Sequence, residues 1–425
     1  MLKIFLIMML MMIMKNKIKN LFFSLILILL NLNLQNFYLN KISYIFMSDL
    51  ISFWISNMSI WILMIINLME KKNNFKNMII FLSLFLIMTF NIWNFLIFYI
   101  LFEISMFLIL MILIIWGYQP ERMEAILYMI FLTFIFSLPF FFFIVKESYN
   151  SLNYFIMNNQ NNQFLMMSFL MIFMVKIPFY FIHIWLPKAH VESPIFGSMI
   201  LAAIMLKLGS YGIFRMYKLM INLHKMKIII ISICLWTIII LSMNCLIQND
   251  IKLLIAYSSI VHMMIMMSNI FMFKYKSMLS SLLIIIGHGL CSSILFFISF
   301  IMYNNSKSRN ILLNKGMINI MPNIMFFWFI SCMNNMPAPP SINFLGEILC
   351  MKNLISWSFL TMFILIIINF LSSMYSILLF IIPFNNKFSK NNIKINNCNN
   401  LNFIISFTHI YPLMIMWFKM NFIIL

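Results

Sequence analysis

Long apolar stretches separated by short polar joints make up almost the whole chain. Hydrophobic residues account for 64% of the 425 residues and charged residues for only 9%, whereas a soluble domain carries about 25% charged residues. One packed core in water cannot cover so much apolar surface, so the chain needs lipid as a second apolar solvent. The sequence therefore predicts an all-α polytopic membrane protein, because unpaired backbone polar groups are not tolerated in lipid and the alternation typical of a β-barrel is absent.

The apolar stretches allow about 14 transmembrane helices of roughly 20 residues each. We expect them near residues 2–14, 21–37, 49–69, 77–91, 94–116, 123–145, 164–186, 195–217, 228–247, 252–273, 278–303, 317–349, 354–383 and 401–420. The Asn-rich stretches 157–163 and 385–400 are expected to be loops, and no polar segment is long enough for a separate soluble domain. No small-residue cleavage site follows the first apolar run, so we interpret that run as a span and not as a cleaved signal.

The chain is strongly basic, with 28 basic and 9 acidic residues and a net charge of +19. In a soluble protein this balance would suggest a nucleic-acid partner. Here the basic residues lie mostly in the joints between apolar stretches, where lipid head groups and basic-loop orientation account for them better. We therefore expect membrane lipids as partners and no nucleic acid.

Motifs for cofactors and metals are missing from the sequence. None of the six cysteines forms a CxxC pair, although iron–sulfur ligation needs closely spaced cysteines, so we expect them to be small buried hydrophobic residues. The glycines of "GHG" (287–289) and "GSYG" (209–212) do not form a dinucleotide or phosphate-binding loop. Zinc needs a compact ligand set, which the sequence lacks. We expect no cofactor and no metal in this chain.

Prolines interrupt the apolar pattern at two places. Pro178 and Pro187 lie in the first, and the second is "NNMPAPPSINFLGE" (334–347). Proline removes a backbone donor and breaks a helix, and irregular backbone at membrane depth survives only where protein or a wet cavity surrounds it. Paired broken helices are typical of ion sites in transporters with inverted repeats. The interval of five spans between the two breaks fits two inverted five-helix repeats.

Four ionisable residues lie well inside apolar stretches: Glu103, Lys176, Lys207 and Glu347. Each would cost about 2.5–3.5 kcal/mol at the centre of a bilayer, so all four are expected to face the helix bundle, a partner or water. Buried ion pairs that only hold helices together are an alternative, but such pairs are a weak source of stability. We favour a proton path, because burial and a nearby carboxylate shift the pKa of a lysine in opposite directions.

Four histidines lie in or next to apolar stretches, as these ionisable residues do: His183, His190, His262 and His288. Lys176, His183 and His190 are seven residues apart, which would place them on one face of a continuous helix. Histidine changes charge near neutral pH and can relay protons. The histidines His224 and His409 have no such neighbours and are expected to be structural.

The remaining acidic residues lie at or near the ends of apolar stretches, where we expect charges at the level of the lipid head groups. They are Asp49, Glu70, Glu121, Glu124, Glu147, Glu192 and Asp250. Lys188 and Glu192 in particular are expected to be loop or interface charges at the end of the first broken segment.

Five segments together resemble a known family: "WGYQPERMEA" (116–125), residues 175–212, "NDIKLLIAYSSIVHM" (249–263), "GHGLCSS" (287–293) and "PAPPSINFLGE" (337–347). They are similar to the antiporter-like membrane-arm subunits of mitochondrial NADH:ubiquinone oxidoreductase (respiratory complex I), and within these to subunit 4. The resemblance is strong over 90–350 and weaker outside that range.

The resemblance implies roles for the residues singled out above. It pairs Glu103 on a fifth helix with Lys176 on a broken seventh helix and makes Lys207 the central lysine. It also implies a hydrated relay formed by His183, His190, His262 and His288, and an exit residue, Glu347, on a broken twelfth helix. A glutamate at that last position favours subunit 4 over its siblings, which usually carry lysine there.

The resemblance also implies the setting of the chain. It predicts a multi-pass protein of the mitochondrial inner membrane, with other membrane-arm subunits, including the sibling antiporter-like subunits, as partners. NADH, FMN, iron–sulfur clusters and ubiquinone would be held by other subunits. We expect N-terminal helices at 1–76, a first repeat at 77–217, a second repeat at 228–383, and a polar loop with a last helix at 384–425.

Three functions are carried forward from the sequence. The first is a proton-translocating subunit of complex I, which couples electron transfer in other subunits to proton pumping. The second is a cation/proton antiporter outside complex I. The third is a scaffold without transport, in which the buried charges only hold helices together.

Overall fold

The computed structural model describes residues 40–41, 47–69, 73–92, 94–117, 121–147, 163–220, 224–385 and 400–418. The spans expected at 2–14 and 21–37 lie outside these residues, as do almost all of the loops expected at 157–163 and 385–400. The two-residue strands β1 (Asn40–Lys41) and β2 (Met47–Ser48) pair antiparallel.

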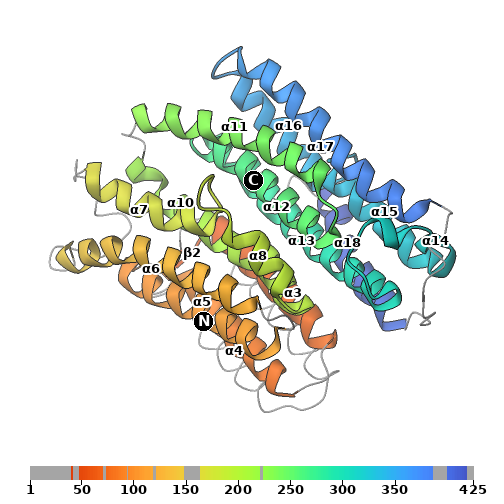
Figure 1. Cartoon of the computed structure of the whole chain (residues 1–425). Coiled ribbons are helices and arrows are strands. Elements are labelled where there is room, and N and C mark those ends of the chain that lie inside the picture. The colour runs from red at the N-terminus through yellow and green to blue at the C-terminus, as the bar shows by residue number, and fades with distance from the viewer. Residues whose placement is uncertain are drawn as a thin grey trace. The chain divides into compact units, whose positions relative to one another are not determined.

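Helices form nearly all of the described structure (Figure 1). They are α3 (Leu50–Met69), α4 (Asn73–Asn91), α5 (Phe95–Trp116), α6 (Arg122–Glu147), α7 (Gln163–Lys176), α8 (Trp185–Glu192), α9 (Ile195–Ile200), η1 (Leu201–Met205), α10 (Leu206–Met220), α11 (His224–Ile247), α12 (Ile251–Ile270), α13 (Tyr275–Ser306), η2 (Leu312–Asn314), α14 (Met317–Ile320), α15 (Pro322–Asn335), α16 (Ile342–Ile355), α17 (Thr361–Phe384) and α18 (Asn400–Phe418). Nine helical segments of the described chain are long and apolar enough to cross a membrane. The all-α membrane fold is thereby confirmed, while the count of 14 helices and the inverted repeats stay predictions.

The chain forms two compact units. The first comprises residues 1–176 and 207–222, and the second comprises 177–206 and 223–425. The chain thus leaves the first unit directly after Lys176 and re-enters it at Lys207. The repeat boundaries expected from the sequence stay a prediction.

Helices that follow one another along the chain pack together in the first unit, α3 on α4, α4 on α5, α5 on α6 and α6 on α7. A Cβ atom at Gly212 would come 2.1 Å from the ring of Phe173, so α10 approaches α7 closely only because this residue has no side chain. The hydroxyl of Tyr211 donates to the carbonyl of Phe90 at 2.6 Å. These contacts fix α10 against the aromatic core of the unit.

Helix α13 is the central element of the second unit and packs against α9, α12, α15, α16 and α18. Its 32 residues make it about 48 Å long, and the whole of its most apolar stretch is buried. A Cβ atom at Gly287 would lie 2.0 Å from Oδ1 of Asn343, and one at Gly346 would lie 2.9 Å from the side chain of Ile284. The two glycines therefore allow α13 and α16 to approach closely.

Both interruptions expected from the prolines are present, although Pro187 lies inside α8 and not in a break. Helix α7 ends at Lys176, and a non-helical segment that contains Pro178 and Phe181 (φ 72°) leads to α8. Helix α15 ends at Asn335, and a segment with Pro337 (φ 22°) precedes α16. In both segments the backbone leaves the helical region because proline cannot donate a hydrogen bond to the preceding turn.

Three expected spans differ from the observed helices. The span expected at 164–186 ends as a helix at Lys176, and that at 317–349 is divided into α14, α15 and α16. The span expected at 354–383 starts later, since α17 begins only at Thr361.

Candidate functional site

The first unit contains an acid–base pair on neighbouring helices, made of a buried lysine and a half-buried glutamate. Lys176 ends α7 and is 2% exposed, and Glu103 lies in the middle of α5. The two side chains interact electrostatically, and the ammonium of Lys176 lies 3.6 Å from the ring centroid of Phe102. Among the described residues, Lys176 Nζ and Glu103 Oε1 have no hydrogen-bond partner. A cation–π contact offsets only part of the free-energy cost of burying a cation. The ammonium of Lys176 therefore lies beside an aromatic ring and a nearby carboxylate, without a hydrogen bond to an acceptor among the described residues.

Lys207 is completely buried in α10 of the first unit. It is the second residue after the π-helical turn η1, and single π-turns occur frequently at functional sites. The carbonyl of Lys207 accepts a hydrogen bond from the hydroxyl of Ser210 at 2.9 Å. The local backbone thus places a long cationic side chain in a fully buried position.

His183 and His190 are not related by helical periodicity, contrary to the prediction from their spacing. Segment 177–184 is not α-helical, so seven residues do not correspond to two turns there. His183 stacks on Tyr180 at 5.5 Å between ring centroids, and His190 of α8 stacks on Phe296 at 4.7 Å. The reason for the difference is the break itself, which the spacing argument ignores.

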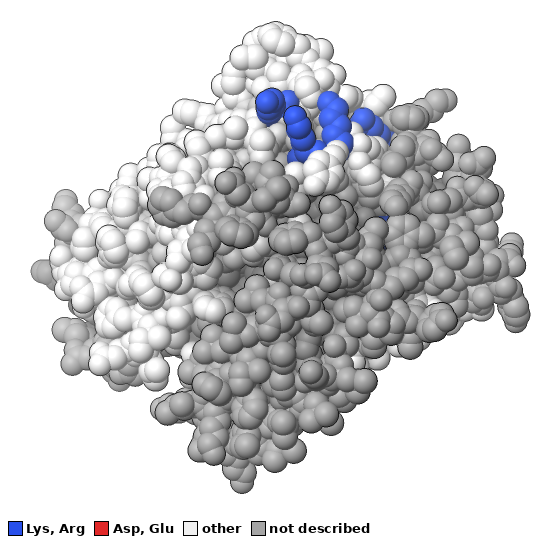
Figure 2. All heavy atoms as spheres, turned by 180° about the vertical axis from the view of Figure 1, so that it is seen from behind, with Lys and Arg blue, Asp and Glu red and all other residues white. Residues whose placement is uncertain are grey.

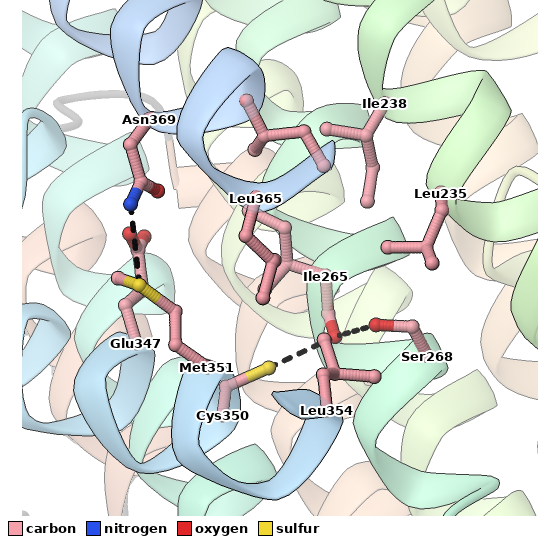
Figure 3. Close-up of a pocket in the computed structure, with 11 residues that line it drawn as sticks. Leu235, Ile238, Ile265, Ser268, Glu347, Cys350, Met351, Leu354, Leu365 and Asn369 are labelled. Carbon is pink, nitrogen blue, oxygen red and sulfur yellow. Dashed lines mark hydrogen bonds between the residues drawn. The ribbon is translucent and has the colours of Figure 1, made fainter. Parts of the chain in front are cut away.

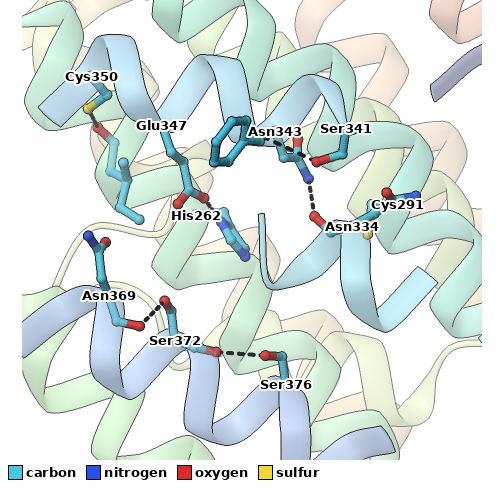
Figure 4. A network of polar contacts seen from close by, with 12 residues as sticks. His262, Cys291, Asn334, Ser341, Asn343, Glu347, Cys350, Asn369, Ser372 and Ser376 are labelled. Carbon is cyan, nitrogen blue, oxygen red and sulfur yellow. Dashed lines mark hydrogen bonds and ion pairs between the residues drawn. The ribbon is translucent and has the colours of Figure 1, made fainter. Parts of the chain in front are cut away.

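The second unit joins three of the predicted residues. His262 of α12 points toward Glu347 of α16, with Nδ1 of the imidazole 3.1 Å from Oε1 of the carboxylate (Figure 4). The rings of His262 and His288 of α13 have centroids 5.5 Å apart. All three side chains are buried. The arrangement provides a carboxylate and two imidazoles from three different helices within a few ångströms of one another.

Polar contacts hold α16 next to the break that precedes it. Ser341 caps the helix by accepting a hydrogen bond from the amide of Phe344 at 3.3 Å. The amide group of Asn343 donates to the carbonyl of Asn334 at 3.0 Å and so connects α16 to the end of α15. Figure 4 shows this contact beside the Glu347 carboxylate. The interrupted backbone is therefore fixed on both sides of the break, which places Glu347.

A small cavity adjoins Glu347. About 10 Å³ of it is open to the centre of a water molecule, which is room for about one water. Figure 3 shows Glu347, Met351 and Asn369 on one side of the cavity and the apolar side chains of Leu235 and Ile238 on the other. Asn369 donates to the sulfur of Met351 at 3.2 Å. Glu347 thus has His262 as one neighbour and, as another, a largely apolar cavity that Ser268 and Asn369 also line.

Comparison of the chain with known proteins shows the family to which it belongs. The chain is 38% identical over 422 residues to NADH-ubiquinone oxidoreductase chain 4 of Ceratitis capitata, a match that covers 96% of this chain and 93% of that protein. It is 39% identical over 405 residues to the protein of the same name from Aedes aegypti, with 92% and 91% covered. The chain belongs to the NADH-ubiquinone oxidoreductase chain 4 family. The resemblance noted in the sequence is confirmed.

Two further comparisons agree with membership of the chain 4 family. Residues 93–374 match the family described as NADH:quinone oxidoreductase/Mrp antiporter, TM. A chain of the solved structure "Respiratory complex I from Thermus thermophilus with bound NADH" is similar with a TM-score of 0.87, and the match covers 98% of this chain and 94% of that one. At 16% sequence identity, this second match shows the fold alone.

The sequence did not predict that Glu192 and Lys252 are both buried in this member of the chain 4 family. Glu192 at the end of α8 is 5% exposed and Lys252 in the first turn of α12 is 9% exposed, so the prediction of a loop or interface charge at Glu192 is wrong. Lys252 donates to the carbonyl of Ser193 at 3.3 Å and interacts electrostatically with Glu192 and Arg309. Both residues lie at the ends of apolar stretches, and packing of the helix ends buries them.

The described residues contain no group of three or more His, Cys, Asp or Glu side chains that could hold a metal ion. His409, which the sequence left as structural, is buried and shares a hydrogen bond with the hydroxyl of Ser293 at 3.1 Å. The five cysteines in the described part of the chain are free and buried, whereas Cys398 lies outside it. The chemistry offered by the described site is therefore that of lysine, histidine and glutamate.

Proposed function

We propose that this chain is the proton-translocating subunit 4 of the membrane arm of NADH:ubiquinone oxidoreductase in the mitochondrial inner membrane. Electron transfer from NADH to ubiquinone would take place in other subunits, which would also hold FMN and the iron–sulfur clusters. This chain would contribute to the H⁺-translocating enzyme without a redox centre of its own. The relatives named NADH-ubiquinone oxidoreductase chain 4 support the assignment.

The observation that carries the proton-transfer role is the buried contact between His262 and Glu347 beside a cavity with room for one water. A carboxylate can hold a proton as an acid or accept one from an imidazolium. Rotation of the Glu347 side chain would move its oxygen from His262 toward the cavity. A water molecule there would find Asn369 and Glu347 as polar partners. Glu347 would in this way pass a proton between a fixed base and water.

Glu103 and Lys176 would perform the corresponding step in the first unit. Two unit charges about 4 Å apart interact by about 4 kcal/mol at an effective dielectric near 20. Moving one charge against 100 mV costs about 2.3 kcal/mol. An interaction of that size between Glu103 and Lys176 would be large enough to make Lys176 release or retain a proton. Lys207, buried in the same unit, would be the next carrier.

His183, His190 and His288 would extend the relay within the second unit. His190 and His288 are buried, His183 is half-buried in the non-helical segment before α8, and His288 lies next to His262. Their stacking partners keep the rings oriented, as Phe296 does for His190. A proton relay needs such groups to keep their positions while water molecules between them reorient.

The alternative of a cation/proton antiporter outside complex I has less support. The curated relatives that match over nearly the full chain carry the name NADH-ubiquinone oxidoreductase chain 4, and the description of the matching family includes both the oxidoreductase and Mrp antiporters. Such an antiporter would exchange Na⁺ or K⁺ for protons without NADH. Vesicles that contain the complex would show this exchange directly.

The test is Lys207→Gln in the whole complex, reconstituted into vesicles. We expect NADH-driven proton uptake to fall about 100-fold or more, in the range typical for loss of a positioned acid–base group. Lys307→Gln is the matched control, because this exposed lysine follows α13 and belongs to no buried cluster. Normal proton uptake and turnover in the Lys207→Gln complex would overturn the proposed function.

A further inference from the structure

Lysines from three helix ends meet at one end of the second unit. Lys274 donates to the hydroxyl of Ser356 at 2.8 Å, which connects the start of α13 to the end of α16. Lys227 of α11 lies close enough to Lys274 for the two cations to repel each other, and it donates to the carbonyl of Met272 at 3.4 Å. Lys276 and Lys352 are exposed in the same two helices, near Lys274 and Ser356 respectively. We call these four lysines the basic cluster.

The basic cluster has no acidic neighbour within its own chain segments. The segments 224–231, 271–281 and 350–361 contain no Asp or Glu. Figure 2 shows Lys and Arg side chains gathered at one end of the visible face. Like charges held close together destabilise a fold. An anion that binds between the lysines would relieve this repulsion.

Large apolar side chains are exposed around the same helix ends. Tyr275 is 71% exposed next to Lys274 and Lys276, and Phe359 and Leu360 are 70% and 76% exposed in the turn that follows α16. Free phosphate would contact the lysines but would make no favourable contact with these apolar side chains. A phospholipid combines a phosphate with acyl chains, and aromatic residues at the membrane–water interface are typical contacts of the region between the two.

We propose that the basic cluster binds the phosphate of an anionic phospholipid, whose acyl chains contact Tyr275, Phe359 and Leu360. The exposed lysines Lys274, Lys276 and Lys352 provide the charge, while Lys227 is half-buried and supports Lys274 from α11. Orientation of loops during insertion also uses basic residues, but it does not require them to gather beside exposed aromatic side chains. The inference does not depend on the proton-transfer role of the chain.

The test uses the purified complex in vesicles of phosphatidylcholine that contain a photoactivatable phosphatidylglycerol probe. After irradiation, mass spectrometry of the peptides identifies the labelled residues. We expect labels in segments 271–281 and 350–361 and about a fivefold loss of labelling for each of Lys274→Gln, Lys276→Gln and Lys352→Gln, equivalent to about 1 kcal/mol per lysine. Lys307→Gln at the opposite end of α13 is the matched control and should leave labelling unchanged.

Three results would overturn the proposal. Equal labelling by a photoactivatable phosphatidylcholine would show that charge has no role. Absence of labelling by the phosphatidylglycerol probe, together with binding of inorganic phosphate at these lysines at constant ionic strength, would identify a phosphate site without lipid. Protection of both segments by a neighbouring subunit, detected as protein–protein cross-links at the same lysines, would assign the cluster to a protein partner. The probe comparison uses the unaltered complex, so it decides the question even where a variant fails to assemble.

Discussion

The imidazole Nδ1 of His262 lies 3.1 Å from Oε1 of Glu347, and both side chains are buried. The contact joins α12 to α16 across 85 residues of chain, and α16 begins only after the proline-rich interruption. Glu347 also lines a small cavity, and the proposed function would use this carboxylate to exchange protons between His262 and the cavity.

Replacement of Glu347 by Gln should abolish this exchange. Glutamine has nearly the same shape and can still contact His262, but it cannot bind or release a proton. We expect NADH-driven proton uptake by reconstituted complex to fall about 100-fold, while the complex assembles normally. Glu347→Asp keeps the acid and should retain part of the uptake. Full uptake in Glu347→Gln would show that Glu347 has no role as a proton carrier.

Replacement of both members of the Glu103–Lys176 pair distinguishes proton transfer from a purely structural role. Glu103→Gln alone leaves a buried ammonium with only the Phe102 ring beside it, a change that costs about 3–5 kcal/mol for a buried charge. The double variant Glu103→Gln with Lys176→Met removes both charges and should assemble better than the single variant. Assembly is measured by native gel and NADH oxidation by absorbance.

Proton uptake by the assembled double variant distinguishes the two roles of the pair. If the pair carries protons, the assembled double variant should have lost proton uptake. If the pair only holds α5 and α7 together, assembly and coupled activity should both return to the level of the unaltered complex, and the scaffold interpretation would then be correct.

Gly287→Ala should loosen the packing of α13 on α16. The added Cβ would lie 2.0 Å from Oδ1 of Asn343, and overpacking of a core costs about 1–3 kcal/mol. Because Asn343 connects α16 to α15, its displacement should also move Glu347. We expect a lower midpoint for thermal inactivation of the complex and reduced proton uptake.

Asn343→Ala in the Gly287→Ala background provides the control. It removes the oxygen that the new Cβ meets, so the two changes should be less destabilising together than the sum of the single changes. Strict additivity of the two effects would contradict the explanation by a clash.

Arg215 connects α10 to the start of α3 in the first unit. It forms an ion pair with Asp49, and its Nε donates to the hydroxyl of Tyr211 at 2.7 Å. Arg215→Gln leaves the half-buried carboxylate of Asp49 without its cation, which should cost about 1–3 kcal/mol. Asp49→Asn added to this variant should recover part of the loss in thermal inactivation experiments. No recovery would mean that the contact with Tyr211, and not the ion pair, carries the effect.

The sequence predicted several features because they depend on single residues. Proline cannot donate the backbone hydrogen bond of a helix interior, and Pro178 and the 337–340 segment lie at the two interruptions. Proline alone does not locate a break, since Pro139, Pro383 and Pro412 lie inside α6, α17 and α18. The charges of Lys176, Lys207 and Glu347 stand out because so few charged residues occur in apolar stretches. All three are buried, as their cost in lipid requires.

The predictions that went wrong depended on continuity of a helix or on the position of a residue within a stretch. The spacing of His183 and His190 suggested one helical face, but the backbone between 177 and 184 is not helical. Glu192 was expected to be solvated because it lies at the end of a stretch, yet it is 5% exposed. Neither result can be obtained from local composition, because both depend on what packs against the segment.

The sequence by itself thus determined that this protein folds in a membrane, that it is helical and to which family it belongs. Apolar composition, prolines and charges in apolar stretches determine these features because each residue has its own free-energy cost in water or in lipid, whatever packs against it. Only the tertiary structure decided which charges meet. The contact of His262 with Glu347 requires α12 and α16 to pack on α13, and Gly287 allows that packing because it leaves room for Asn343. Close approach of helices depends on shapes that lie far apart along the chain, and no local pattern records them.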